Sequence, residues 1–287
     1  MPSYAHQEFS LPTHDLPTKS KPIALEKIAY SNAYDFTKKH RHRYFELLFF
    51  EKGGGSQLID FEEYIVQDHS CYIVLPNQIH LLKRNPKSHG FLLQFYSASL
   101  SSKEILRFLQ TRGWNKLSGL VFENDKDQFY YYKQLCAYIA NTDEHNNFSM
   151  EKDRHIIQAC LFSLFSKESK TKVLDGSQSV VHAFLNSVEE NFTTQQTVKF
   201  YMKAIGTHEK KLMEATKKHL GMTPLKVIHA RILLEAKRLL VFDDRSQKEI
   251  TYILGFDSPS SFSAFIKAKT GNTVSQLQTT LVGIHNK

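Results

Sequence analysis

Two short helices around a tight turn, close to the C-terminus, constrain this chain more than any other stretch. Residues 250–254 place apolar side chains at i, i+3 and i+4, which is the spacing of one buried helix face. Gly255 follows, where a helix end needs a residue that tolerates a left-handed backbone. Asp257 or Ser258 then suits the N-cap of a second helix, which Gly271 closes. The stretch therefore predicts a helix-turn-helix.

A weaker copy of this pattern precedes it. Residues 197–221 combine a short apolar helix, a turn at Gly206 and a second helix that ends at Gly221. This pair and the pair at 246–271 flank a connecting helix that Pro224 opens. Some eighteen residues at 1.5 Å each make that helix about 27 Å long, within reach of the ~34 Å turn of DNA. Both second helices are therefore expected to enter adjacent major-groove segments on one face of a duplex.

The positive charge is concentrated in the same part of the chain. At 287 residues the chain exceeds one typical domain, so two are expected. Residues 177–287 carry 15 Lys and Arg against 9 Asp and Glu, a net +6, whereas residues 1–176 carry 22 against 20, a net +2. This distribution is typical of a C-terminal half that meets phosphates, although lysines that only solubilise a surface would give a similar count.

The cysteines and the N-terminal stretch indicate a compartment. Cys71, Cys136 and Cys160 are scattered, without a C-x-x-C pair, which argues against a disulfide framework or a cysteine zinc site and fits a reducing cytosol. The first twenty or so residues lack the apolar core of a signal peptide, and no stretch approaches the ~20 apolar residues of a membrane span. We therefore expect a cytoplasmic protein with no membrane partner.

The pattern of apolar residues changes from β to helical along the N-terminal half. Short apolar runs separated by Gly, Pro and Asn predict a small barrel or jelly roll. Helical spacing follows, interrupted by a turn-like stretch at 113–127, and these helices are expected to pack on the barrel or against a second copy. The predicted α+β order is a flexible arm (1–22), a cupin-like barrel (23–100), a helical or dimerisation region (101–170), a linker (171–179) and an all-α domain (180–287).

A group of histidines and one glutamate lies in the predicted barrel. His40-x-His42-x-x-x-Glu46 puts three side chains on one face of a strand, because residues at i, i+2 and i+6 point the same way. This resembles the first cupin motif, which implies that these residues and His80 can hold a metal; imidazole and carboxylate suit a divalent transition metal. The segment before His80 departs from the cupin pattern, so we favour a metal-free sensory pocket, and polar residues that only cap the barrel are a third interpretation. The candidate ligand-binding residues are His40, His42, Tyr44, Glu46 and His80.

The linked helix pairs resemble the DNA-binding domain of the AraC/XylS family of bacterial transcription regulators, over about residues 180–278. The residues that carry the resemblance are Leu212, Gly221, Met222, Thr223, Pro224, Arg231, Ile232, Glu235, Ala236, Lys237, Arg238, Leu239, Leu240, Glu249, Ile250, Leu254, Gly255, Phe256, Ser260, Phe262, Ser263, Lys267 and Gly271. The barrel half resembles the family's cupin-like sensory domain. The chain departs from the family pattern at Thr251 and Met202, where a small alanine is usual, and at Ala264 and Glu214, where a longer polar or a basic residue is usual.

The second helix of each pair is expected to present its residues to base edges and phosphates. Lys210 can bond guanine, Glu214 can accept from cytosine and Met213 can meet a thymine methyl, whereas Lys217 and Lys218 suit phosphates. The short serines of the second pair suit phosphates or close base contacts, and Lys267 is a phosphate candidate. The candidate DNA-binding residues are His208, Lys210, Lys211, Met213, Glu214, Lys217, Lys218, Ser258, Ser260, Ser261, Ser263, Ala264 and Lys267.

Three functions fit this sequence. The leading hypothesis is a bacterial transcription regulator, such as an activator, that binds promoter DNA, responds to a small-molecule effector in the barrel, uses no cofactor and catalyses no reaction. The resemblance implies RNA polymerase as a partner, and a homodimer fits the helical region. The alternative is a cupin-type metalloenzyme with an appended helical domain, in which His40, His42, Glu46 and His80 hold iron or manganese. A DNA-binding protein whose barrel only makes dimer contacts is the third.

Overall fold

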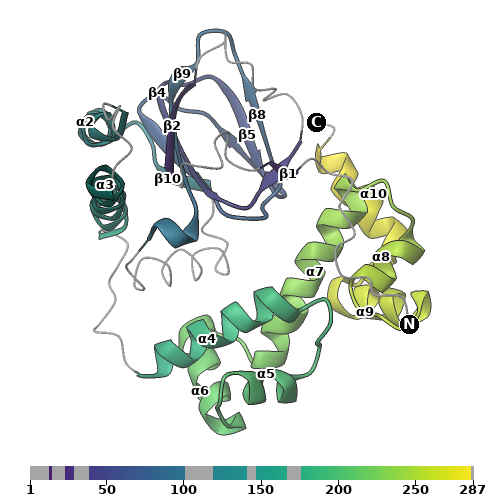
Figure 1. Cartoon of the computed structure of the whole chain (residues 1–287). Helices are drawn as coiled ribbons and strands as arrows, with labels where there is room; N and C mark the ends of the chain where they lie inside the picture. The colour runs from purple at the N-terminus through teal and green to yellow at the C-terminus, as the bar shows by residue number, and fades with distance from the viewer. Residues whose placement is uncertain are drawn as a thin grey trace. The chain divides into compact units, whose positions relative to one another are not determined.

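The computed structural model describes residues 13–14, 23–28, 39–100, 119–140, 147–166 and 176–285. The chain divides into two compact units, one formed by Pro12–Lys170 and one that contains Thr171–Lys287. The first is built mainly of strands and the second of helices (Figure 1). The two units are described separately below.

Two antiparallel sheets form the first unit. The larger has the order β10 (Gly119–Phe122), β7 (Ser70–Val74), β4 (Phe45–Lys52), β9 (His89–Phe95) and β2 (Ile23–Ile28). The smaller has the order β6 (Glu62–Ile65), β5 (Gly55–Ile59) and β8 (His80–Arg84). A short parallel pair, β1 (Thr13–His14) with β3 (Arg41–His42), and a bridge between His40 and His80 complete the pairing.

Strand β4 separates two cores, because its side chains alternate between the faces of the sheet. Phe45, Leu47 and Phe49 face outward and pack with α2 (Lys126–Ala140) and α3 (Asn147–Ser166). Both helices lie beside this face of the sheet in Figure 1. Leu48 and Phe50 face inward, where they meet apolar residues of the smaller sheet. The helices thus close one side of the larger sheet, and the smaller sheet closes the other.

The interior between the sheets changes in character along β4. Its apolar part consists of Ile28, Leu48, Phe50, Ile59, Val66, Tyr72, Val74, Leu82 and Leu92. Glu46 continues the inward row of Leu48 and Phe50, and Gln94 continues the inward row of Leu92 on β9. Because both polar residues are buried on the inward face, the interior ends in a polar region at that end of the sheet.

Seven helices of the second unit lie in the described residues. They are α4 (Gly176–Asn191), α5 (Val198–Ala204), α6 (Glu209–Leu220), α7 (Pro224–Phe242), α8 (Gln247–Ile253), α9 (Pro259–Thr270) and α10 (Val274–His285). Thr223, followed by Pro224, caps α7, and Ser246 begins α8 with a capping box to Glu249. Gly221 and Gly271 end α6 and α9 in the left-handed conformation that glycine favours.

Helix α7 connects the two helix-turn-helix pairs, α5–α6 and α8–α9, and contacts helices of both (Figure 1). Arg231 on α7 is 5% exposed, and its Nε donates to both carboxylate oxygens of Glu189 on α4 at 2.9 Å. Its Nη1 donates to Glu235 at 2.9 Å, and Arg238 donates to the same carboxylate at 3.3 Å. The Arg231 guanidinium also lies 4.0 Å from the centre of the Phe192 ring. This ionic cluster fixes α4 against α7.

The α+β architecture predicted from the sequence is confirmed: a barrel with flanking helices and two helix-turn-helix pairs joined by one long helix. Four details differ. Residues 119–122, expected to be turn-like, form β10 and extend the barrel past residue 100, because they pair with β7. Residues 80–84 form β8, which was not foreseen. Thr13–His14, in the predicted arm, pairs with β3. The helical spacing at 105–109 lies outside the described residues.

The fourth difference is the start of helix α4. It begins at Gly176, inside the stretch 171–179 that was expected to be a linker. Polar residues dominate this first turn, so its sequence shows no apolar period. A tertiary contact stabilises the turn instead: Ser177 Oγ lies 2.7 Å from His219 Nε2 on α6. Such a contact between distant residues is invisible in the local sequence.

Gly255 and Gly271 provide a matched test of how the helix pairs are packed. Both have a left-handed φ, 76° and 77°, but a Cβ at Gly255 would lie 2.0 Å from the Thr193 carbonyl oxygen, whereas a Cβ at Gly271 would meet nothing within 4 Å. We expect Gly271→Ala to destabilise the helical unit by about 1–2 kcal/mol through backbone strain. Gly255→Ala should incur the same strain and lose about 1–3 kcal/mol more stability, because the backbone must shift to make room for the Cβ. Urea unfolding followed by circular dichroism at the helical band measures both, and equal losses would contradict this packing.

Candidate functional site

Helix α6, the second helix of the first pair, presents a basic surface. Its N-cap is His208, whose ring nitrogen accepts from the Lys211 amide, and its inner face buries Leu212, Ala215, Thr216 and Leu220. The other face leaves Lys210, Lys211, Glu214, Lys217 and Lys218 exposed, with Met213 half-buried. The predicted contact residues of this pair therefore lie on the side of α6 that faces away from the core.

Helix α9, the second helix of the second pair, uses several of its predicted contact residues in hydrogen bonds within the helix pair. Ser258 is the N-cap: its Oγ accepts from the Ser261 amide, and the Ser261 hydroxyl accepts from the Ser258 amide. Ser263 Oγ accepts from the Gln247 side chain of α8 at 3.2 Å. Ser260, Ala264 and Lys267 are exposed. The serines at 258, 261 and 263 were expected to meet DNA, and the structure gives each a structural hydrogen bond.

Gln196 joins the two helix-turn-helix pairs, and sequence reasoning missed it. It lies between α4 and α5, and its Nε2 donates to the Leu254 carbonyl at 3.0 Å, in the turn between α8 and α9. Gly255 in that turn approaches the Thr193 carbonyl in the same segment. A glutamine in a loop carries no signal for such a contact, which depends on the tertiary fold.

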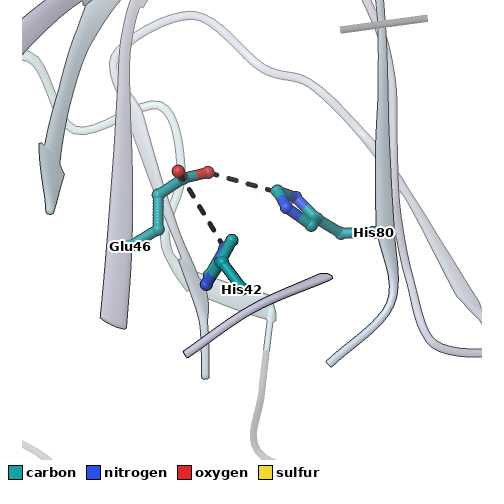
Figure 2. Close-up of side chains that lie close together, drawn as sticks. All are labelled: His42, Glu46 and His80. Atoms are coloured by element: carbon teal, nitrogen blue, oxygen red, sulfur yellow. Dashed lines mark ion pairs between the residues drawn. The ribbon is translucent and has the colours of Figure 1, made fainter. Parts of the chain in front are cut away.

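The barrel holds a second candidate site, in the polar region at the end of its interior. His42 on β3, Glu46 on β4 and His80 at the start of β8 converge there, as Figure 2 shows. The Glu46 carboxylate lies 4.0 Å from His42 Nε2 and 4.0 Å from His80 Nδ1. One ligand atom from each of the three residues lies within 4.8 Å of the other two. All three residues are at most 4% exposed.

The structure brings the other predicted barrel residues to the same place. The His40 ring lies 4.1 Å from that of His80, and the Tyr44 ring stacks on His42 at 4.0 Å. His40 and Tyr44 are 3% and 1% exposed. The five residues that the sequence proposed for ligand binding thus form one buried cluster.

Hydrogen bonds behind this cluster orient its side chains. His42 Nδ1 donates to the Tyr44 carbonyl at 2.8 Å, which leaves Nε2 with its lone pair toward Glu46. Gln94 Nε2 donates to Glu46 at 2.7 Å. The Asp60 carboxylate accepts from the Gln78 side chain at 3.0 Å and from the Ile79 amide at 3.2 Å, so it holds the loop that carries His80.

Gln57 and Gln94 are the members of this site that sequence reasoning missed. Both are buried, and Gln57 Nε2 lies 3.3 Å from His80 Nδ1. Within the described part of the chain, the Oε1 atoms of both glutamines accept no hydrogen bond. The strand alternation that placed Glu46 inside would also have placed Gln94 inside, since these residues are paired in the ladder.

Burial changes the acidity of Glu46. Loss of hydration raises the pKa of its carboxyl to about 7; the Gln94 hydrogen bond opposes this shift and the negative charge of Glu26 adds to it. The cluster therefore combines two imidazoles with a carboxylate whose charge is costly to hold without a compensating cation. Chemically, this is a donor set of two nitrogens and one oxygen that suits a divalent transition metal.

The two units correspond to two family models. Residues 22–129 match the AraC-like ligand binding domain, and residues 201–280 match a helix-turn-helix domain. The chain belongs to the AraC/XylS family. It is a transcription regulator that binds DNA through its helical unit, and this membership favours the regulator over the cupin-type metalloenzyme.

Relatives of this AraC/XylS-family chain are similar along most of its length. The transcriptional activator RhaS of Enterobacter sp. strain 638 is 20% identical over 263 residues, which cover 88% of this chain and 90% of RhaS. RhaS of Escherichia coli strain SMS-3-5 is 23% identical over 239 residues, covering 80% and 83%. The structure of ToxT from Vibrio cholerae O395 aligns with a TM-score of 0.42 and 14% identity over 93% of this chain and 100% of ToxT, a likeness too weak to carry an argument.

None of the helices in the described ranges is long and apolar enough to cross a membrane.

Ser258 and Ser260 allow capping to be separated from DNA contact. Ser258→Ala should lower the stability of the helical unit by about 1 kcal/mol, because the first turn of α9 loses its cap. Ser258→Asn should restore most of that loss, since asparagine caps as well as serine does. Ser260→Ala removes an exposed hydroxyl with no capping role and should change stability by less than about 0.5 kcal/mol. Thermal unfolding of the three variants measures these differences. Equal melting temperatures for Ser258→Ala and the wild type would contradict the capping role.

Proposed function

We propose that this regulator activates transcription by binding one face of promoter DNA with two recognition helices, α6 and α9. An effector bound in the barrel controls this binding. The observation that carries the proposal is the arrangement α6–α7–α9. A helix of 19 residues joins the two pairs, which makes it about 28 Å long at 1.5 Å per residue. That length is comparable to the ~34 Å that separates successive major-groove segments on one face of a duplex.

The two recognition helices are proposed to have different roles. Helix α6 carries the long side chains, with Lys210 and Glu214 near its N-terminal half for base edges and Lys217 and Lys218 further along for phosphates. Helix α9 offers exposed Ser260, Ala264 and Lys267. Since an alanine and a short serine reach few base edges, we propose that α6 supplies most of the base discrimination and that α9 adds phosphate contacts and sensitivity to DNA shape.

The effector is proposed to act by shifting an equilibrium between forms of the two-domain chain. A ligand changes such an equilibrium only to the extent that it binds one form more tightly than the other. The buried cluster around Glu46 is the proposed binding site, because it gathers polar groups inside an otherwise apolar interior. RNA polymerase is the proposed partner of the DNA-bound form, and the cytoplasm is the proposed location.

A homodimer is proposed through α2 and α3. Their inner faces pack on the barrel, but large apolar side chains remain on the outside: Tyr131 is 52% exposed, Tyr138 66%, Phe148 88% and Phe162 53%. Surface aromatics on two neighbouring helices support contact with a second copy. Sedimentation equilibrium of the wild type and of Phe162→Ser tests this proposal, which a monomeric wild type would contradict.

Two lysines of α6 test the proposed division between base and phosphate contacts. Lys217→Ala should weaken binding to all sequences about equally and reduce the slope of log affinity against log salt by about 1, because one phosphate contact is lost. Lys210→Ala should instead lower discrimination at one base position, by about 1–3 kcal/mol. Gel-shift titrations against a preferred site, enriched from random DNA by the wild-type protein, and against scrambled DNA measure both effects.

Lys126→Ala is the matched control, since it removes an exposed lysine from the barrel unit. It should leave both the affinity and the salt slope unchanged. A wild-type protein that binds the enriched and scrambled duplexes equally would overturn the proposed function.

A further inference from the structure

We propose that His42, Glu46 and His80 form a binding site for one divalent transition metal ion, and that this ion is the effector of the regulator. The second part rests on the proposed function, because it names the chemical class of the effector that controls DNA binding. The first part rests on the geometry of the barrel alone.

The separations of the three ligand atoms favour an ion as the ligand over an organic molecule. The three ligand atoms lie within 4.8 Å of one another, whereas two ligand atoms on one ion are separated by about 3–4 Å when metal bonds are ~2.0–2.2 Å long. Shortening the longest of these separations by about 1–2 Å therefore brings all three atoms onto one ion. The rings of His40 and Tyr44 pack on those of His80 and His42, at 4.1 Å and 4.0 Å between ring centres.

Hydrogen bonds also orient the three ligand side chains, as they do in known metal sites. The Tyr44 carbonyl accepts from His42 Nδ1, which leaves Nε2 as the donor atom. Gln94 holds Glu46, and Asp60 holds the loop before His80. The three ligands come from β3, β4 and β8. Binding an ion would therefore link the larger sheet to the smaller one, which provides a physical route from the site to the shape of the barrel.

Two glutamines complete the fit. Gln57 lies 3.3 Å from His80 Nδ1, so its amide must give up this contact when the nitrogen ligates an ion. The buried Oε1 atoms of Gln57 and Gln94, which accept no hydrogen bond within the described residues, are then available to water carried by the ion. Nitrogen and oxygen donors together favour manganese, iron, cobalt, nickel or zinc over magnesium or calcium.

Direct titration of the full-length protein tests the site. Protein stripped with a chelator and dialysed should bind one Co²⁺ per chain, with visible absorption of nitrogen and oxygen ligation and without the near-ultraviolet band of thiolate ligation. The second criterion matters because Cys71, Cys136 and Cys160 are buried in the same unit and offer a competing soft site. Zn²⁺ and Mn²⁺ should compete with Co²⁺, and Mg²⁺ should not.

Variants then assign the ligands. His42→Gln, His80→Gln and Glu46→Gln should each weaken Co²⁺ binding at least about tenfold, since even the loss of a group behind a ligand has that effect. His89→Gln is the matched control on β9, because His89 is exposed, and it should bind as the wild type does. Where a variant fails to fold, the Co²⁺ stoichiometry and absorption spectrum of the wild type still test whether the site exists.

The same metal-free preparation, tested in a gel shift with and without Co²⁺ or Zn²⁺, separates the two proposals. A change in DNA affinity of about tenfold or more, of the size usual for coupled sites, is expected for the wild type and not for Glu46→Gln. Less than one ion per chain, thiolate ligation or unchanged binding by His42→Gln would overturn the metal site. Metal binding without any change in DNA affinity would overturn the effector role. Loss of sequence-preferring binding in all conditions would instead overturn the proposed function.

Discussion

The helical unit depends on one ionic cluster carried by its central helix. Arg231 is buried on α7 and is paired with Glu189 of α4 and with Glu235 one turn along, over the ring of Phe192. A buried charge is tolerated only while its partners are in place, and removing one partner of a pair buried on both sides, such as Arg231–Glu235, costs about 3–5 kcal/mol. Because α7 also packs against α5, α6, α8 and α10, its fixed position sets where both recognition helices lie. The proposed geometry of DNA recognition therefore depends on packing far from the side chains that we propose to contact DNA.

The barrel contains a different arrangement, in which Gln94 donates to Glu46 and the rings of His42 and His80 lie 4.0 Å from its carboxylate. The pKa of Glu46 is raised to about 7 because its burial outweighs the hydrogen bond from Gln94. In the helical unit, buried carboxylate and guanidinium groups are matched within the fold; in the barrel, a carboxylate and two imidazoles converge within 4.8 Å. This contrast distinguishes a cluster that holds the fold together from one that is prepared to receive a ligand.

Local signals account for what the sequence could predict. Helix ends, glycine turns and apolar periods lie within a few residues of one another, so α8 and α9 were predicted with the turn at Gly255 between them, and Ser258 emerged as the N-cap. Strand alternation placed Glu46 inside the barrel. Tertiary contacts account for what the sequence could not predict. Strand β10 forms because it pairs with β7, and the first turn of α4 is stabilised by the contact between Ser177 and His219. Gln196 joins the two helix pairs through its hydrogen bond to the Leu254 carbonyl. The exact roles of Ser261 and Ser263 likewise required the structure, because composition cannot separate a cap from a DNA contact.

In the proposed function, α7 holds the two recognition helices at a fixed spacing, so that they bind one face of DNA together. The most direct measurement is the affinity for a site selected from random duplexes, before and after inserting about 5 base pairs, half a helical turn, between its two halves. We expect this insertion to reduce the affinity to that of one isolated half. An insertion of about 10 base pairs should not restore it, because a packed helix cannot lengthen. Equal affinity for the original site and the site with half a turn inserted would show that the two helices do not bind as one rigid unit.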